Sequence, residues 1–457
     1  MSLYTQLCSQ VIFPLHEQLK HHDSVAVRQR LEEQQWQPRD DLEAWRVARL
    51  KEFLTRVGTH VPYYRDLFAR NGFRPEALAT VDDLRVLPLT DKAMMRAAGD
   101  ALKAENAQNL SRYNTGGSSG EPLIFYIGKD RKSHDVGAKW RVTRWWGVDI
   151  GDPEIVVWGS PIELGAQDRV RMIRDKLLRT ELLPAFEMSK DNLDRFVDTI
   201  RSRRPAMLFG YPSSLSMIAK HAQSKGIRLD NIGIKVAFVT SERLYDEQRA
   251  TIQEIFGCPV ANGYGARDAG FLAHECPQGG MHLQAEDIII EIVDTDGNPL
   301  PHGQAGEIVV THTASHEFPF IRYRTGDIGV LSDDTCACGR TLPLLKEIQG
   351  RTTDFIVAAN GTIMHGLSLI YTARDLPGMQ QFKIIQHSLE HTEVMLVTRP
   401  PFGPDSEERL IRDYKARLGQ DVRVTLTHVA EIPREKSGKY RYVVSHVNSA
   451  AAQASQG

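Results

Sequence analysis

Apolar residues recur at two different spacings along the chain. Up to about residue 110 the spacing is mainly helical, as where Leu42, Trp45 and Phe53 follow roughly one helical face. Between residues 150 and 350, short apolar runs alternate with amphipathic segments, which favours strands joined by crossover helices. The pattern therefore predicts one long α/β region.

The pattern changes near residue 351 and predicts a smaller α+β unit. Its expected elements are a strand at 354–359, a turn at Asn360 and Gly361, a helix, a strand at 393–399, a helix at 406–419 and a strand at 422–429. The last residues are small and polar, which is typical of disorder. The predicted organisation is a large domain over 1–350, a small domain over 351–445 and a disordered tail over 446–457.

The bulk composition is that of an ordinary globular enzyme. The 457 residues predict two or more domains, and the 56 basic and 58 acidic side chains nearly cancel. At 41% hydrophobic and 25% charged residues, the sequence favours neither a nucleic-acid-binding nor a membrane-surface protein. It has no apolar stretch that would span a bilayer, no secretory leader, and five cysteines without the spacing of a disulfide scaffold. We expect a cytoplasmic protein.

The first segment that carries chemistry runs from Tyr113 to Pro122 and is rich in glycine and hydroxyl side chains. Its glycines let the backbone expose N–H groups and its hydroxyls add donors, a combination that suits a polyphosphate. The residues concerned are Thr115, Gly116, Gly117, Ser118, Ser119 and Gly120. The segment lacks the Lys-Ser/Thr pair of a Walker A loop, and a strand rather than a helix is expected after it. The alternative is a plain hairpin turn.

Further segments follow this loop in a fixed order. They are Thr240–Glu242, Asn262–Asp268, Tyr323–Asp327, Gly350–Asp354 and Ser437–Lys439. The series resembles the adenylate-forming superfamily of acyl- and aryl-CoA synthetases, luciferases and peptide-synthetase adenylation domains. Within it, the chain is similar to the phenylacetate-CoA ligase branch and its capsule-biosynthesis, CapK-like members, from about residue 40 to about 445.

The resemblance implies an α/β adenylate-forming fold, with a large multi-sheet N-terminal domain and a small mobile α+β C-terminal lid domain. It also implies roles for single residues. Asp327 would accept hydrogen bonds from the ribose hydroxyls of ATP, assisted by Arg351, and Tyr264 would stack on the adenine. The same nucleotide wall would include Ser241, Glu242, Asn262 and Gly263. The alternatives are an Asp-Gly turn and an aromatic residue packed in a core.

Three positions carry the catalytic expectations of the resemblance. Asp268 stands where the family usually has a glutamate that helps to hold Mg²⁺ on the phosphates, and its shorter side chain would reach the metal through water. Lys439 would neutralise the carboxylate and the α-phosphate as they react. Asp354 would be the hinge about which the small domain turns. Without the family, Lys439 would read as an ordinary surface lysine.

Two short loops each offer a pair of metal ligands. Cys276 and His282 flank the turn 277–280, and Cys336 and Cys338 form a tight Cys-x-Cys turn. Together they predict a closed tetrahedral structural zinc site. His274 is an alternative fourth ligand, and four unrelated thiols and imidazoles are the alternative to a metal. Some members of the phenylacetate-CoA ligase branch carry zinc in such an arrangement.

The resemblance implies an enzyme that uses ATP and Mg²⁺ to make an acyl-adenylate from a small carboxylic acid, with coenzyme A as the acyl acceptor. One alternative is transfer to an amine or hydroxyl in polysaccharide or capsule biosynthesis, and another is a non-catalytic nucleotide-binding protein on the same fold. Lys439 argues against the last, because a binding module needs no mobile lysine. Phe209–Ser214 lies where the branch builds part of its acyl pocket. A homodimer is a candidate assembly.

Overall fold

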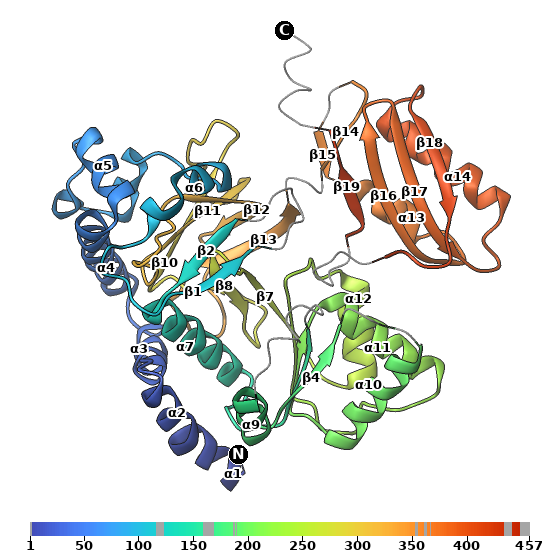
Figure 1. Ribbon diagram of the computed structural model, residues 1–457. Helices are drawn as coiled ribbons and strands as arrows, with labels where there is room; N and C mark the ends of the chain where they lie inside the picture. Colours follow the sequence, from blue (N-terminus) through green and yellow to red (C-terminus); the bar gives the residue numbers. More distant parts are fainter. Residues whose placement is uncertain are drawn as a thin grey trace. The chain divides into compact units, whose positions relative to one another are not determined.

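The protein divides into two compact units, Met1–Gln349 and Gly350–Gly457 (Figure 1). The computed structural model describes residues 2–115, 123–158, 169–185, 188, 190–351, 355–360, 363–365, 367–433 and 441–447. All five cysteines lie in these ranges and are free thiols. Within the same ranges no helix is both long and apolar enough to cross a membrane.

One eleven-stranded sheet forms the centre of the first unit, in the order β10-β11-β12-β13-β9-β8-β7-β6-β5-β3-β4. Its strands are β3 Glu154–Trp158, β4 Thr180–Pro184, β5 Met207–Gly210, β6 Val236–Thr240, β7 Val260–Ala266, β8 Gly270–Glu275, β9 Met281–Leu283, β10 Ile288–Val293, β11 Ala305–His312, β12 Tyr323–Ser332 and β13 Leu344–Arg351. A separate antiparallel hairpin, β1 Ser111–Asn114 and β2 Ile124–Ile127, flanks residues 115–123.

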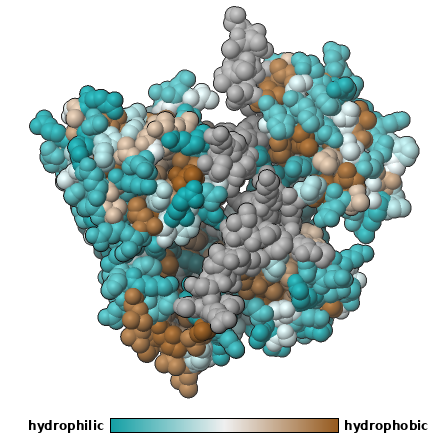
Figure 2. Space-filling model, in the orientation of Figure 1, coloured by the Kyte–Doolittle hydropathy of each residue, from teal (hydrophilic) through white to brown (hydrophobic). Residues whose placement is uncertain are grey.

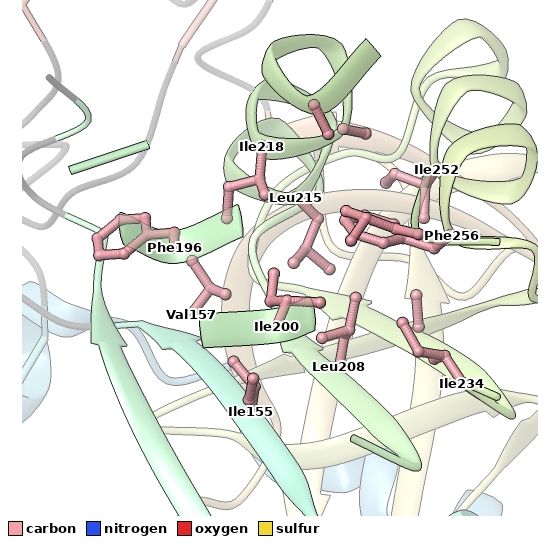
Figure 3. Close-up of a cluster of buried hydrophobic side chains, with 14 of the residues drawn as sticks. Ile155, Val157, Phe196, Ile200, Leu208, Leu215, Ile218, Ile234, Ile252 and Phe256 are labelled. Carbon is pink, nitrogen blue, oxygen red and sulfur yellow. The ribbon is translucent and has the colours of Figure 1, made fainter. Parts of the chain in front are cut away.

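The half of the sheet from β4 to β7 is parallel and has helices on both faces. The helices are α7 Lys129–Trp145, α9 Arg169–Leu177, α10 Lys190–Arg203, α11 Pro212–Ser224 and α12 Asp246–Phe256. Figure 3 shows the core beneath α10, α11 and α12, where Phe196, Leu215 and Phe256 meet Val157 and Leu208 of the strands. The opposite face packs against Val142 and the two tryptophans at the end of α7. Because these strands are buried on both faces, they read as continuous apolar runs.

The other half of the sheet corrects the sequence-based expectation of crossover helices. The pairs β7–β8, β8–β9, β9–β13, β10–β11 and β11–β12 are all antiparallel. The apolar run of β11 was expected to be wound with helices, but only the turn segment 294–304 separates it from β10. A parallel connection needs about a dozen residues and usually a helix, so this short link permits only a hairpin.

The antiparallel half curls around its own apolar interior, which includes Tyr264, Ile290, Ile308, Val310 and Leu345. The side chains of Tyr264 in β7 and Asp327 in β12 are hydrogen-bonded although β8, β9 and β13 lie between their strands. This contact shows how strongly the sheet is curved. Two register shifts, one next to Gly265 in β7 and one in β11, accompany this curvature. Bulges of this kind increase the local bend and twist of a strand.

Helices that precede the sheet cover one side of the unit (Figure 1). They are α1 Leu3–Leu7, the π-helix η1 Cys8–Ile12, α2 Phe13–Leu19, α3 Ser24–Gln34, α4 Arg39–His60, α5 Pro62–Asn71 and α6 Lys92–Ala98, with 3₁₀ turns at Pro75–Ala77, Val81–Val86 and Gly99–Leu102. Leu50, Phe53 and Tyr64 of α4 and α5 pack against Phe125 of β2 and Phe320 before β12. This second core joins the hairpin that bears the Gly/Ser loop to the sheet.

The second unit is a small α+β structure. A four-stranded sheet, β18-β17-β16-β19, is accompanied by a two-stranded ribbon and two helices. The elements are β14 Phe355–Val357, β15 Ile363–His365, α13 Leu367–Arg374, β16 Met379–Ser388, β17 His391–Thr398, α14 Pro404–Leu418, β18 Arg423–His428 and β19 Val443–Ser445. Tyr414 of α14 donates a hydrogen bond to the carbonyl of Leu369 of α13, at 2.9 Å.

Three strands of this unit, β15, β16 and β19, are absent from the elements that we expected from the sequence. In β16 the inward positions are Phe382, Ile384 and Gln386, so a polar residue interrupts the apolar alternation. The Gln386 amide is buried because it pairs with the backbone of Val357, donating at 2.7 Å and accepting at 3.0 Å. The hydrogen bonds to Val357 therefore compensate for the burial of Gln386, whose polar side chain conceals this strand in the sequence pattern.

Candidate functional site

The predicted nucleotide residues of the first unit lie at the carboxyl ends of the parallel strands and on the strands next to them. Ser241 follows β6, and Tyr264 lies near the end of β7. Ligands of open α/β sheets bind at these ends, where the strands diverge and loops are free to vary. The topology thus gathers residues that are far apart in the sequence.

Tyr264 and Asp327 are brought together by the curled sheet. The hydroxyl of Tyr264 donates a hydrogen bond to Oδ2 of Asp327 at 2.9 Å, and both side chains are buried. The turn before Asp327 is fixed as well, because Glu307 accepts from the backbone N–H of Gly326 and Thr325 Oγ1 accepts from that of Asp327. The Asp327 carboxylate is therefore held in one orientation before any ligand binds.

Asp268 lies in the turn between β7 and β8 and is also buried. Its Oδ2 accepts a hydrogen bond from the hydroxyl of Tyr323 at 2.6 Å, and its Oδ1 accepts from the backbone of Ala269 at 3.2 Å. Arg131, fully buried in α7, donates to the carbonyl oxygen of Asp268 at 3.3 Å. Sequence reasoning missed Tyr323 and Arg131 as supports of this site. The sequence signal that could have identified Tyr323 is its place in the Tyr323–Asp327 segment, which also contains Asp327.

The backbone of β7 and β8 approaches closely at this turn. A Cβ at Gly265 would collide with the carbonyl oxygen of Gly270, so the position requires glycine. Gly263 lies against the imidazole of His274, and the N–H of Asn262 donates to Glu275 at 2.8 Å. The Asn-Gly-Tyr-Gly sequence is thus demanded by packing as much as by any ligand.

Ser241 and Glu242 follow β6 in an unusual conformation. Ser241 has a φ of 70°, in the left-handed region that non-glycine residues seldom adopt. Glu242 Oε2 accepts a hydrogen bond from the N–H of Ser213, in the first turn of α11, at 3.3 Å. A carboxylate is favoured there because the helix N-terminus carries exposed N–H groups and a partial positive charge. Glu242 therefore positions the 209–214 segment.

The base of the Gly/Ser loop is closed by Thr115. Its backbone N–H donates to the carbonyl of Leu123 at 3.0 Å, and the N–H of Leu123 donates to Thr115 Oγ1 at 2.9 Å. Gly116, Gly117, Ser118, Ser119, Gly120, Asp354 and Lys439 lie outside the described residues. Arg351 ends β13, and its side chain is likewise not described.

Cys276, His282, Cys336 and Cys338 form one cluster, with ligand atoms within 4.8 Å of one another. Cys276 Sγ is 3.6 Å from Cys336 Sγ, and Cys338 Sγ is 3.2 Å from His282 Nε2. The other ring nitrogen of His282 faces the carbonyl of Leu342 at 3.3 Å, which is the usual way to orient a metal-binding imidazole. Three thiols and one imidazole at these distances suit tetrahedral zinc.

A second group of ionisable side chains, His134, Asp135 and His312, has ligand atoms within the same 4.8 Å limit. Here the guanidinium of Arg131 donates from Nε to both oxygens of Asp135, each at 3.0 Å. Burial opposes ionisation of Asp135, but the nearby Arg131 outweighs it and holds the pKa of the carboxyl well below its usual range. The guanidinium of Arg131 already neutralises the carboxylate of Asp135. We therefore interpret this group of side chains as a support of α7 and of the turn at Asp268, and not as a metal site.

His274, the alternative zinc ligand, does not join the thiol cluster. Its ring is buried, stacks on Phe271 and has no hydrogen-bond partner at either nitrogen among the described residues. Burial, reinforced by Arg141 and Lys139, lowers the pKa of His274 to about 3.

Comparisons with known proteins agree with this architecture. A family model of AMP-binding enzymes matches residues 181–315, and one of the CapK C-terminal domain matches 356–446. The phenylacetate-coenzyme A ligase of Thermus thermophilus is 25% identical over 452 residues, which cover 89% of this chain and 97% of that protein. Protein CapK of Staphylococcus aureus is 23% identical over 412 residues, or 89% and 90% of the two chains. A solved structure of 2-hydroxyisobutyryl-CoA ligase with 2-HIB-AMP has the same fold, with a TM-score of 0.72, 21% identity and 92% of each chain covered.

The pKa of His274 predicts how the stability of the protein depends on pH. Unfolding returns the imidazole to an ordinary pKa of about 6.5, so the unfolded state binds more protons below that pH. The contribution of the neutral buried ring is therefore complete above about pH 6.5 and is lost as the pH falls towards about 3. In His274→Leu, the free energy of unfolding should decrease less on acidification than in the wild type, by about 2 kcal/mol between pH 6.5 and pH 5.

Urea unfolding of both proteins at several pH values would measure this difference. Leu272→Ala, which shortens a buried apolar side chain of the same strand, is the control and should lower the free energy of unfolding about equally at every pH. Identical slopes for His274→Leu and the wild type would contradict the assignment.

Proposed function

Because the chain belongs to the adenylate-forming superfamily, in the branch of the phenylacetate-CoA ligases and CapK, we propose that it is an ATP-dependent, AMP-forming acid ligase. A carboxylate attacks the α-phosphorus of ATP, the bond to pyrophosphate breaks, and an acyl-adenylate forms. The thiol of coenzyme A then attacks the acyl carbon and releases AMP. The observation that supports this most directly is the buried carboxylate of Asp327, which accepts a hydrogen bond from Tyr264.

Asp327 and Tyr264 divide the recognition of the nucleoside between them. The Asp327 carboxylate accepts the two ribose hydroxyls, a task for which its two oxygens provide about four acceptor sites. The Tyr264 hydroxyl donates to Asp327, and the ring of Tyr264 would stack on the adenine. Asn262, Gly263, Ser241 and Glu242 complete the wall, and Arg351 assists at the ribose.

The Gly/Ser loop holds the phosphates of ATP. Thr115 anchors the loop at its base, and because its oxygen accepts from Leu123, its own hydroxyl proton remains available for a phosphate oxygen. The backbone and hydroxyl donors of Gly116–Gly120 supply the remaining contacts. Asp268 would help to hold a Mg²⁺ ion that neutralises charge on these phosphates, and its carboxylate is oriented for this role by hydrogen bonds from Tyr323 and Ala269.

Aromatic side chains support an apolar acid as substrate. Trp158 stacks on Tyr211 with 4.4 Å between ring centroids, and Phe209 lies 5.7 Å from the same tryptophan. These rings stand at the carboxyl ends of β3 and β5, beside the segment that Glu242 positions. We infer an acyl pocket with an aromatic wall there.

The second unit, over residues 351–445, acts as the lid domain of the family and the first, over 1–350, as the domain of ATP and acid. Lys439 neutralises the two anions that meet in adenylation and leaves when the lid turns about Asp354 for acyl transfer. The match of residues 356–446 to the CapK C-terminal domain also favours a second candidate, acyl transfer to an amine or hydroxyl of a polysaccharide. Thioester formation with coenzyme A distinguishes the two acceptors.

An exchange assay tests adenylation independently of the acceptor. We expect labelled pyrophosphate to enter ATP only when a suitable acid is present, over a panel of aryl, fatty and sugar acids. If folded protein that binds ATP gives no exchange with any acid of the panel, the non-catalytic alternative is favoured instead.

Replacement of the mobile lysine separates the two half-reactions. Lys439→Ala should lower the exchange rate by on the order of a hundredfold or more, because one charge is lost from the adenylation transition state. ATP affinity and thioester formation from supplied acyl-adenylate should remain close to the wild type. Lys415→Ala, which removes a lysine of α14 in the same unit, is the control and should change neither step. Equal losses in both steps would refute the role.

We also propose that Cys276, His282, Cys336 and Cys338 bind one structural zinc ion. Cys276 follows β8, His282 lies in β9, and Cys336 and Cys338 follow β12. The ion would therefore tie the β8–β9 hairpin, which follows Asp268, to the end of β12, the strand that contains Asp327. Four protein ligands leave no open position, and the ion therefore takes no part in the reaction.

Metal analysis tests this site. Protein purified without a metal-binding tag should contain about one equivalent of zinc, and Cys336→Ser with Cys338→Ser should lose both the metal and thermal stability. Cys258→Ala, which removes a buried cysteine outside the cluster, should keep the zinc. Less than about half an equivalent of zinc in the wild type, or unchanged stability of the double variant, would reject the site.

A further inference from the structure

The N-terminal arm, which comprises α1, η1 and α2 from Leu3 to Leu19, has one buried face and one exposed apolar face. One face is buried against the body of the first unit and consists of Thr5, Cys8, Ser9, Phe13 and Glu17. The other is open to solvent and consists of Leu3, Leu7, Val11, Leu15 and Leu19, with exposed fractions from 45% for Val11 to 85% for Leu3. Figure 2 shows an apolar surface over this end of the molecule. Four leucines and a valine exposed to water in one row are unusual for a monomer.

The π-helix in the middle of the arm aligns the exposed residues. They are spaced by four residues, and at about 100° per residue such a row would rotate by roughly 160° over four steps of an α-helix. The π turn Cys8–Ile12 takes up one additional residue, which removes about 100° of this rotation. Pro14 explains the wide turn, because proline has no N–H and clashes with the preceding turn of an α-helix. The sequence therefore builds one continuous apolar face, which we call the leucine face.

The arm is fixed to the body and does not hang from it. The Tyr4 hydroxyl donates to the carbonyl of Leu177 at 2.8 Å, and the Thr5 hydroxyl donates to Asp152 at 2.8 Å. Phe13 packs edge-on against the buried Trp140, with 5.1 Å between centroids. With the inner face of the arm occupied, the leucine face stays exposed to water among the described residues of this unit.

The exposed area of the leucine face is close to the area that one partner contributes to a standard protein interface. Leu177 and Ile173 of α9, which lies beside α1, are also exposed and extend it. These seven side chains expose on the order of 700 Å², against the ~800 Å² that each partner contributes to a standard interface. The exposed polar residues of the arm that lie near these side chains are Ser2, Gln6, Gln10 and Gln18. No charged residue of the arm is exposed before Lys20. Depletion of charge at the centre is typical of protein interfaces.

A lipid surface is a poorer partner for this composition. Helices that lie on anionic membranes carry lysines and arginines along the polar side, and recognition of anionic lipids uses clusters of about four to eight of them. Among the described residues at the end of the arm and in and after α9, the exposed basic side chains are Lys20, Lys176 and Arg179, and Arg179 lies over the ring of Tyr4, while Arg174 is paired with Asp175. A protein surface of equal size and apolarity is the better match.

We propose that the leucine face is the contact of a homodimer, in which the arms of two copies pack antiparallel across a two-fold axis. The row is symmetric about Val11, so an antiparallel pair places Val11 against Val11 of the partner subunit and each Leu7 against a Leu15. One surface thus supplies both halves of the contact.

Cysteine cross-linking tests the register. Val11→Cys should form an intermolecular disulfide under mild oxidation, because the two-fold axis places its two copies within the ~4.4–6.8 Å between Cα atoms that a disulfide requires. Leu19→Cys is more exposed but would lie about 24 Å from its own copy along the helices, so it should not cross-link. The wild type gives the background from the native thiols. Absence of a Val11→Cys dimer, or equal cross-linking of Leu19→Cys, would overturn the antiparallel pairing.

Sedimentation of the full chain tests the dimer itself. The wild type should be dimeric at micromolar concentration, and Leu7→Glu with Leu15→Glu should raise the dissociation constant at least about 100-fold while the far-UV circular dichroism is unchanged. Gln18→Glu adds charge to the arm outside the leucine face and should leave the dimer intact. A monomeric wild type, or a dimer that survives both glutamates, would refute the proposal, as would a monomer that sediments with phosphatidylglycerol vesicles in place of self-association.

Discussion

Closure of the antiparallel half of the sheet is the constraint on which the rest of the first unit depends. Four strand-to-strand steps separate β7 from β12, which in a flat sheet would be roughly 19 Å. Tyr264 and Asp327 nevertheless meet at 2.9 Å, and Tyr323 and Asp268 at 2.6 Å. The apolar interior stabilises this curvature by removing both faces of the strands from water. Without it, the two carboxylates would face solvent in separate places.

Buried charges fix how the helical layers join this curled sheet. Arg322 forms a bidentate pair with Glu291 at 2.9 and 3.0 Å and donates to the carbonyl of Leu87 at 2.6 Å. Arg141 of α7 pairs with Glu286 in the same way, with both side chains fully buried. Such pairs add little to stability, since desolvation offsets their attraction, but breaking one costs several kcal/mol. They therefore select one docking of the layers against others of similar apolar area.

The same logic connects the thiol cluster with the N-terminal arm. In both, the folded unit holds side chains in an arrangement that it does not itself satisfy. Three thiols around His282 leave polarisable sulfur without strong hydrogen bonds, and the leucine face leaves apolar area in water. A metal ion in the first case and a second subunit in the second would satisfy these groups by physically different means.

The sequence by itself determined the elements whose patterns are local. The apolar runs of β3, β5 and β6 and the helix α14 follow from periodicity, because a strand buried on both faces and an amphipathic helix each leave a repeat that no partner is needed to interpret. Asp327 and the Gly/Ser loop could be proposed as a nucleotide site from their order and residue types. Cys276, His282, Cys336 and Cys338 could be grouped because each pair lies within one short loop.

Only the tertiary structure decided the rest. The antiparallel pairing of β11, the burial of Gln386 and the support of Asp268 by Tyr323 and Arg131 depend on partners far away in the chain, and such partners leave no periodic trace. The structure also distinguished His282 from His274: the two residues are directly paired in β8 and β9, but His282 belongs to the thiol cluster, whereas the ring of His274 stacks on Phe271. The leucine face became visible only when Phe13 and Thr5 were seen to occupy the inner side of the arm, because burial is a property of the assembled molecule.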